Sequence, residues 1–299
     1  MIDLVCIMGP TASGKTKIAV DLVQKGGFEI ISVDSAQIYQ YMDIGTAKPS
    51  AKTLAIAPHR LISIKDPAET YSVAEFLSDV EREIKAIISN NNIPLLVGGS
   101  MMYFNALQKG LAILPDADKS VRAGLYKRQN TEGLEVLYKE LQEKDPKTAG
   151  RIHPNDSQRI LRALEVYMLS GKTLSELQSK AQQQPKYTFY NFVLMPDDRT
   201  VLHQTIEQRF DQMLDRGFVA EVENLYNRGD LQPDMPAMRS VGYRQLWRHL
   251  AGEYDLDHAR IRGIIATRQL AKRQMTWLRS WNEAIVIKNQ HDIYAQLRL

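Results

Sequence analysis

A glycine-rich octapeptide near the start of the chain has the composition of a phosphate-binding loop, G-x-x-x-x-G-K-[ST]. It follows an apolar run and precedes an amphipathic stretch, the strand-loop-helix order that such a loop needs. Its glycines let backbone N–H groups face a bound anion, its lysine can neutralise phosphate charge, and its last hydroxyl can bind Mg²⁺. We therefore predict a diphosphate or triphosphate site with Mg²⁺ at Thr16, formed by Gly9, Pro10, Thr11, Ala12, Ser13, Gly14, Lys15 and Thr16.

A carboxylate, Asp34, follows the next apolar run at residues 30–33. Ligands of open α/β sheets bind at the carboxyl ends of strands, so Asp34 is expected beside the phosphate loop. There it can accept a proton from a nucleophile or hold a water of Mg²⁺, or it can simply cap the turn that follows. Ser35, Gln37 and Tyr39 add hydrogen-bonding and stacking groups suited to a base.

A third apolar run, at residues 94–97, ends in Gly98, Gly99 and Ser100. An NTPase usually carries an acidic partner for Mg²⁺ at such a strand end, and the next acidic residue here is Asp116. This pattern weakens the case for ATP hydrolysis, although Asp34 could serve. Ser100 is expected as an N-cap, a ligand contact or both.

Basic residues gather in the C-terminal third, where residues 258–282 contain six Lys or Arg and no Asp or Glu. On a helix, Arg268, Lys272 and Arg279 fall within about 40° of one another, on an apolar stripe where cations must find anions or water. Backbone phosphates could supply those anions, although a partly solvated face is the commoner arrangement. Trp277 and Trp281 are expected in the core. The segment 239–244 adds two arginines and an aromatic residue around a glycine, a composition suited to RNA.

Alternating strand and helix patterns predict an α/β fold, a parallel sheet flanked by helices. We expect strands at 4–8, 29–33, 61–64, 94–97, 189–195 and 284–288, and helices at 15–25, 73–89 and 101–108. Strand patterns are absent from 116–187, which predicts an all-helical insertion domain there, with the core domain formed by 1–115 and 188–299.

The composition is that of a globular protein of 299 residues, 44% hydrophobic and 24% charged, with a net charge of +3. Apolar runs are too short to span a membrane, and the N-terminus lacks a secretory pattern. Cys6, the single cysteine, cannot form an internal disulfide or a zinc cluster, so we expect a cytoplasmic protein.

Taken together, these motifs closely resemble the family of bacterial tRNA dimethylallyltransferases, also called tRNA isopentenyltransferases or IPP transferases. The resemblance rests on the phosphate loop and on segments at 32–39, 43–49, 71–74, 98–100, 155–159, 239–244 and 272–279, which span nearly the whole chain. Two positions depart from the family pattern: Ser100 stands where Thr is common, and Ser63 where Asp is common.

The resemblance implies a P-loop kinase-like core with a helical insertion, and a tunnel for dimethylallyl diphosphate and a flipped adenine of the tRNA anticodon stem-loop. The implied catalytic residues are Asp34 as base, Lys15, Ser100 and Arg122, with Mg²⁺ at Thr16. A monomer is expected. The implied tRNA contacts are Asp34, Ser35, Ala36, Gln37, Gln158, Arg159, Ile160, Leu161, Arg162, Arg239, Ser240, Val241, Gly242, Tyr243, Arg244, Lys272, Arg273, Gln274, Met275, Thr276, Trp277, Leu278 and Arg279.

Two other functions remain open at this point. A P-loop kinase would use ATP on a nucleotide or small molecule and would not need RNA. A non-catalytic RNA-binding protein would keep only a vestige of the loop, which the intact Lys15 and Thr16 argue against.

Overall fold

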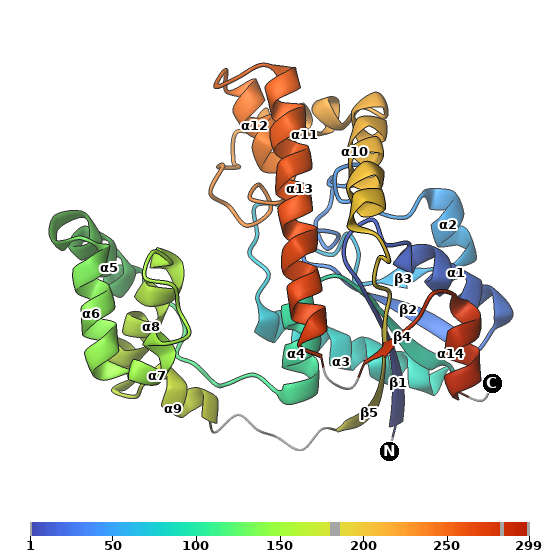
Figure 1. The fold of residues 1–299 in the computed structure, drawn as a ribbon, viewed down its shortest axis with the longest axis horizontal. Coiled ribbons are helices and arrows are strands. Elements are labelled where there is room, and N and C mark those ends of the chain that lie inside the picture. Colours follow the sequence, from blue (N-terminus) through green and yellow to red (C-terminus); the bar gives the residue numbers. More distant parts are fainter. Residues whose placement is uncertain (1, 180–185, 282–283, 298–299) are drawn as a thin grey trace. The chain divides into compact units, whose positions relative to one another are not determined.

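The computed structural model describes residues 2–179, 186–281 and 284–297. The chain forms two compact units, one made of Met1–Ala106 with Lys186–Leu299 and the other of Leu107–Pro185 (Figure 1). The second unit thus begins earlier than the insertion expected at 116–187. Each unit has its own core. No helix in the described ranges is both long and apolar enough to cross a bilayer.

The first unit contains a six-stranded parallel sheet in the order β3-β2-β4-β1-β5-β6, which confirms the predicted α/β fold. The strands are β1 (Ile2–Met8), β2 (Phe28–Val33), β3 (His59–Arg60), β4 (Ile93–Gly98), β5 (Tyr187–Val193) and β6 (Ile285–Val286). The central strands are buried on both faces, as parallel sheets covered by helices require.

Strand register brings three carboxyl ends to one point. Gly98 at the end of β4 pairs with Met8 at the end of β1 and with Val33 at the end of β2. The phosphate loop, Asp34 and the Gly99-Ser100 turn follow these three ends directly. Sequence-distant groups therefore meet at one edge of the sheet.

The strand expected at 61–64 is wrong. Strand β3 ends at Arg60, and both Leu61 and Ser63 have positive φ, at 61° and 52°. A left-handed backbone cannot continue a strand, so the chain turns at this point. The apolar run there instead buries Leu61 in the core.

Helices flank the sheet and form a separate layer beside its carboxyl edge. Helices α1 and α3 have the predicted bounds, and a capping box of Ser72 and Glu75 begins α3. The helices of this unit are α1 (Lys15–Lys25), α2 (Ala51–Ile56), α3 (Val73–Ser89), α4 (Met101–Lys109, which runs past the unit boundary), α10 (Arg199–Asp215), α11 (Phe218–Tyr226), α12 (Tyr243–Leu250), α13 (Leu256–Arg279) and α14 (Gln290–Leu297).

An apolar cluster fixes α10 to α13 onto the loop after β2. Ile38 and Met42 from that loop pack with Phe210, Phe218 and Tyr243. Figure 1 shows α10 and α13 side by side next to the strand ends, in agreement with their packing. The cluster thus places two helices from the C-terminal half over the phosphate loop.

Every regular secondary-structure element in the described residues of the second unit is a helix. Its helices are α5 (Lys119–Glu132), α6 (Leu134–Lys144), α7 (Pro146–Ala149), α8 (Ser157–Ser170) and α9 (Leu174–Ser179). They pack around Leu125, Leu137, Leu141, Ile160 and Leu164.

Candidate active site

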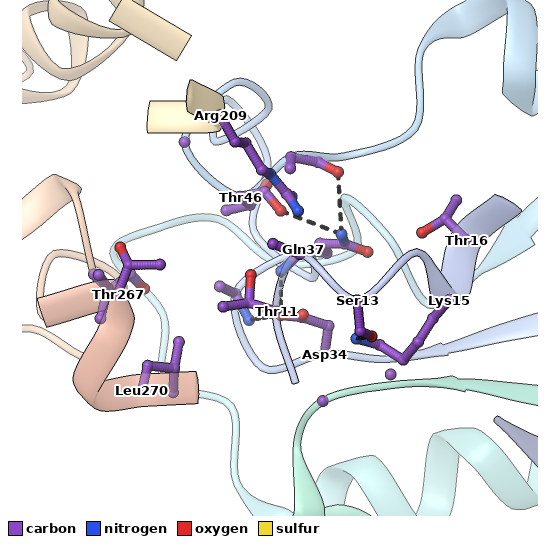
Figure 2. Close-up of a pocket in the computed structure, with 18 of the residues that line it drawn as sticks. Thr11, Ser13, Lys15, Thr16, Asp34, Gln37, Thr46, Arg209, Thr267 and Leu270 are labelled. Atoms are coloured by element: carbon purple, nitrogen blue, oxygen red, sulfur yellow. Dashed lines mark hydrogen bonds between the residues drawn. The ribbon is translucent and has the colours of Figure 1, made fainter. Parts of the chain in front are cut away.

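A pocket of about 310 Å³ lies where the ends of β1, β2 and β4 meet (Figure 2). The phosphate loop, Asp34, Gln37 and the Gly98-Gly99 turn line it from the sheet side. Residues of α10 and α13 line it from the helical side. All of these elements belong to the first unit.

The phosphate loop has the backbone of an anion cradle. Ala12 and Gly14 have positive φ, at 63° and 89°, so the chain curls before α1 begins at Lys15. Gly14 provides no side-chain cap, which leaves N–H groups of the first turn available to a ligand. The loop and the helix N-terminus therefore suit an anion such as a diphosphate.

Lys15 lies in this cradle, and the hydrogen-bond partners of its ammonium group are neutral. Its Nζ donates to the carbonyl of Pro10 at 2.6 Å and to Ser13 Oγ at 3.4 Å. Burial lowers the pKa of Lys15 from 10.5 to about 8; the carboxylate of Asp34 opposes this shift, and the guanidinium of Arg209 adds to it. A bound diphosphate would stabilise the charged form of Lys15.

Asp34 is anchored by one of its oxygens. Oδ1 accepts the backbone N–H groups of Ala36 at 2.9 Å and Gln37 at 3.3 Å. Oδ2 has no hydrogen bond within the described residues, and Asp34 lines the pocket. The residue therefore caps the turn, as one reading of the sequence predicted, and keeps a free oxygen for a substrate.

Side-chain hydrogen bonds hold the neighbouring strand ends together. Ser100 Oγ accepts the backbone N–H of Ser35 at 2.9 Å, which links the turn after β4 to the turn after β2. The Gln37 amide accepts from Ser32 Oγ and donates to the carbonyl of Thr46 at 3.2 Å. Ser100 and Gln37 thus position the segment that carries Asp34.

Arg209 is a pocket residue that the sequence analysis missed. It projects from α10 toward the space bordered by Gln37 and Thr46 (Figure 2), and it has no ion pair or hydrogen bond within the described residues. Burial lowers the pKa of Arg209, an effect that Asp34 partly offsets. A signal was available, because Arg209 interrupts an apolar helical stripe of Ile206 and Phe210.

Apolar side chains form part of the remaining pocket wall. Ile206, Phe210, Met213 and Phe218 line it beside the cationic groups. A ligand with an anionic head and a short apolar tail would satisfy both parts.

The site has oxygen ligands of the kind that Mg²⁺ prefers. The hydroxyl of Thr16 and the carboxylate of Asp34 line the same pocket. No cluster of three His, Cys, Asp or Glu that could hold a metal occurs in the described part of the chain. A magnesium ion here would thus rely on substrate oxygens and waters as well, as it commonly does in phosphate sites.

A family model described as IPP transferase matches residues 37–281. The chain belongs to the IPP transferase family. It is therefore an enzyme that transfers a prenyl group. A curated tRNA dimethylallyltransferase from Legionella pneumophila (strain Lens) is 54% identical over 298 residues, covering 98% of this chain and 95% of that protein.

Solved structures agree with this assignment. The tRNA isopentenylpyrophosphate transferase of Bacillus halodurans is 35% identical, with a TM-score of 0.72 over 99% of this chain and 94% of that one. A eukaryotic dimethylallyltransferase acting on tRNA is 26% identical, with a TM-score of 0.80 over 100% of this chain and 77% of that one.

In this IPP transferase, α13 exposes only part of the segment expected to contact tRNA. Lys272, Arg273, Thr276 and Arg279 are exposed, whereas Met275 and Leu278 are buried, and helical periodicity explains the difference. The buried pair cannot form an RNA surface, which corrects the expectation for them. Gln274 points to the phosphate loop instead.

Two other expectations for α13 are also corrected. Trp277, expected in the core, is 41% exposed, and Trp281 is partly exposed. Arg268, expected to find an anion or water, forms an ion pair with Glu207 at 2.7 Å, so a protein carboxylate supplies the anion.

The segment 239–244, which leads into α12, has some residues in the pocket and others on the surface. Ser240, Val241 and Tyr243 line the pocket, and the Tyr243 hydroxyl donates to Glu221 at 2.5 Å. Arg239 and Arg244 are exposed. Gly242 is buried with a φ of 91°, a conformation that favours glycine.

In the second unit, the basic residues expected at the substrate surround a buried carboxylate. Glu165, 1% exposed, pairs with Arg122 at 2.9 Å and with Arg162 at 2.7 Å. Gln158 and Arg159 are exposed at the start of α8. Ile160 and Leu161 belong to the core of this unit, so the expectation that they contact tRNA is wrong for their side chains. The role of Arg122 at the diphosphate stays a prediction.

Proposed function

We propose that this IPP transferase moves a dimethylallyl group from dimethylallyl diphosphate to N6 of the adenine 3′ of the anticodon (position 37) in tRNAs that read codons beginning with U. The products are N6-dimethylallyladenosine and diphosphate. The observation that carries the proposal is the mixed lining of the pocket, in which the cations Lys15 and Arg209 occur together with the apolar side chains of Phe210 and Met213.

The cationic part of the pocket matches the leaving group. An allylic C–O bond breaks readily because the cation is stabilised by resonance, so the catalyst must mainly hold the charge of the departing diphosphate. The loop N–H groups, Lys15 and Arg209 are suited to this task, and Arg122 is a further candidate. Mg²⁺, held by Thr16 and the diphosphate, would neutralise additional negative charge.

The apolar part matches the prenyl chain and protects it. Ile206, Phe210, Met213 and Phe218 can enclose a five-carbon group in apolar surroundings, because their own side chains carry no hydroxyl or amine. Exclusion of water also prevents hydrolysis of the allylic cation.

Asp34 is the proposed base. As the new N6–C1 bond forms, the C1–O bond breaks and its electron pair leaves with the diphosphate. The adenine nitrogen then loses a proton to Oδ2 of Asp34, whose Oδ1 remains fixed by Ala36 and Gln37. The adenine must leave its stack to reach this carboxylate, at a cost of about a few kcal/mol.

RNA recognition is proposed for the exposed cations on α13 and α12, among them Lys272, Arg273, Arg279 and Arg244. Gln158, Arg159 and Arg162 of α8 are the proposed contacts from the second unit. A monomer in the cytoplasm suffices for this reaction, because Lys15, Asp34 and Arg209 come from one chain.

Competition between donors tests the chemical class of the ligand. We expect dimethylallyl diphosphate with Mg²⁺ to displace a fluorescent diphosphate probe at much lower concentration than ATP does. Inorganic diphosphate should fall between the two, because it lacks the apolar tail. Tighter displacement by ATP than by the prenyl donor would contradict the proposal and favour a kinase.

A further inference from the structure

One side chain outside the sheet ties the phosphate loop to the turn after β4. Gln274 of α13 accepts the backbone N–H of Thr11 through Oε1 at 2.8 Å, and its Nε2 donates to the carbonyl of Gly99 at 2.9 Å. A backbone N–H can only donate and a carbonyl can only accept, so one orientation of the amide satisfies both partners. A single glutamine thus bridges the ends of β1 and β4.

The bridge leaves no room for another side chain at Gly99. A β-carbon on Gly99 would collide with the Gln274 amide nitrogen, although the backbone of Gly99 is not left-handed. Glycine is therefore favoured here by close approach and not by its φ, because a β-carbon would require the Gln274 amide to move. The geometry links Gly99 of the strand-end motif to one residue of a helix far along the chain.

The helix that carries Gln274 is firmly held. Ala271 and Met275, on either side of Gln274 in the sequence, are 1% and 7% exposed in the cluster that joins α10 to α13. Gln274 is therefore a fixed support for the loop and not a mobile surface residue.

We propose that Gln274 is a positioning residue that sets the shape of the diphosphate cradle by bracing Thr11 against Gly99. This inference rests on the proposed function for its substrate, but it concerns the binding of the diphosphate group alone. Gln274 acts through the loop N–H groups and Lys15, which are the proposed diphosphate contacts. This role replaces the tRNA contact expected for Gln274.

The test is binding of inorganic diphosphate with Mg²⁺, measured by calorimetry on the full chain. Gln274→Ala removes both hydrogen bonds of the brace, those to Thr11 and Gly99, and should weaken binding about five- to tenfold, because the loop N–H groups remain but lose their fixed arrangement. Gln269→Ala is the matched control, since Gln269 is an exposed glutamine of the same helix, and it should bind as the wild type does.

Gly99→Ala provides an independent disruption if Gln274→Ala folds poorly. The added methyl group must push the amide away, so this variant should show the same weakening. In the Gly99→Ala/Gln274→Ala double variant the obstacle is gone, and binding should be no weaker than in either single variant. In steady-state transfer assays, KM for the prenyl donor should rise in Gln274→Ala, while KM for RNA should stay constant.

Wild-type diphosphate affinity in Gln274→Ala would overturn the inference, as would fully additive losses in the double variant. If KM for RNA rises in Gln274→Ala and KM for the prenyl donor does not, Gln274 contacts tRNA, as the family resemblance implied. If the wild type binds diphosphate but transfers no prenyl group, the proposed function fails while this inference stands.

Discussion

The carboxylate of Asp34 and the guanidinium of Arg209 attract one another across the pocket without forming an ion pair within the described residues. Each keeps a group free for a ligand: Asp34 its Oδ2 oxygen and Arg209 its N–H donors. The proposed base and the proposed diphosphate-binding cation thus line one pocket, as a reaction between an amine and a diphosphate ester requires.

Arg209→Ala should lower kcat/KM for the prenyl donor about 100-fold, because a preorganised donor to the leaving group is lost. Diphosphate affinity should fall as well. Arg209→Lys should keep part of that affinity, because lysine retains the positive charge but not the planar set of donors. The control is Arg216→Ala, an exposed arginine at the end of the same helix. Equal kinetics for Arg209→Ala and the wild type would remove Arg209 from the mechanism.

Asp34→Asn should lower kcat by about 10²- to 10⁴-fold, because the amide oxygen can still accept from Ala36 and Gln37 but cannot take the proton. Binding of RNA and of diphosphate, measured separately, should change little. Asp34→Ala should lose the turn geometry in addition. Full-rate transfer by Asp34→Asn would show that another group, or water, is the base.

Lys15 should take up a proton when diphosphate binds above pH 8. The pKa of Lys15 is about 8 in the folded protein, below its ordinary value of 10.5. Between pH 8 and pH 10.5 the lysine therefore binds more protons in the unfolded chain than in the folded one, and the contribution of this group to the free energy of unfolding rises with pH. Binding needs the charged form, so affinity should fall as pH rises above about 8. Calorimetry in buffers of different ionisation enthalpy measures the uptake.

The ligand also titrates, so the same titration with Lys15→Met isolates the contribution of the lysine. The variant should bind more weakly and show less proton uptake at pH 9. Identical uptake in both proteins would mean that Lys15 is already charged in the free enzyme.

Glu221→Ala should lower the free energy of unfolding by about 2–3 kcal/mol, because several donors lose their acceptor. Glu221 accepts the backbone N–H groups of Asp43, Ile44 and Gly45 at 2.7–3.1 Å and the hydroxyl of Tyr243. Denaturant unfolding followed by tryptophan fluorescence measures the loss. Glu223→Ala, at an exposed position of the same helix, should change stability by less than about 0.5 kcal/mol.

Transfer by Glu221→Ala should also slow, since the loop it holds supplies the carbonyls of Thr46 and Ala47 to Gln37. Unchanged stability would indicate that water replaces the carboxylate at these N–H groups.

The phosphate loop and Asp34 lie at strand ends along one edge of the sheet, as their sequence patterns predict. The phosphate loop and Asp34 each follow a buried apolar strand, and parallel pairing necessarily brings their ends together. Local pattern failed at 61–64, where two left-handed residues end the strand. No composition signal distinguishes that apolar turn from a strand.

The helical side of the site could not be predicted in the same way. Arg209 has a local signal, since it interrupts the apolar stripe of Ile206 and Phe210, but that signal does not tell which site the residue faces. Arg209 and Gln274 reach the pocket because α10 and α13 pack over it, and such long-range packing is not visible in one sequence. The segment 272–279 of α13 was expected to contact RNA along its whole length. The helix period instead exposes its cations, buries Met275 and Leu278, and turns Gln274 toward the phosphate loop. The side chains of Ile160 and Leu161 are buried in the core of the second unit for the same reason.

The most direct test of the account is transfer of label from dimethylallyl diphosphate with Mg²⁺ to an anticodon stem-loop with adenine 3′ of the anticodon, run beside ATP as the competing donor. We expect label on the exocyclic amine of that adenine, none on a stem-loop with guanine there, and no phosphate transfer from ATP. Phosphate transfer from ATP to a nucleotide, with no label on the RNA, would contradict it.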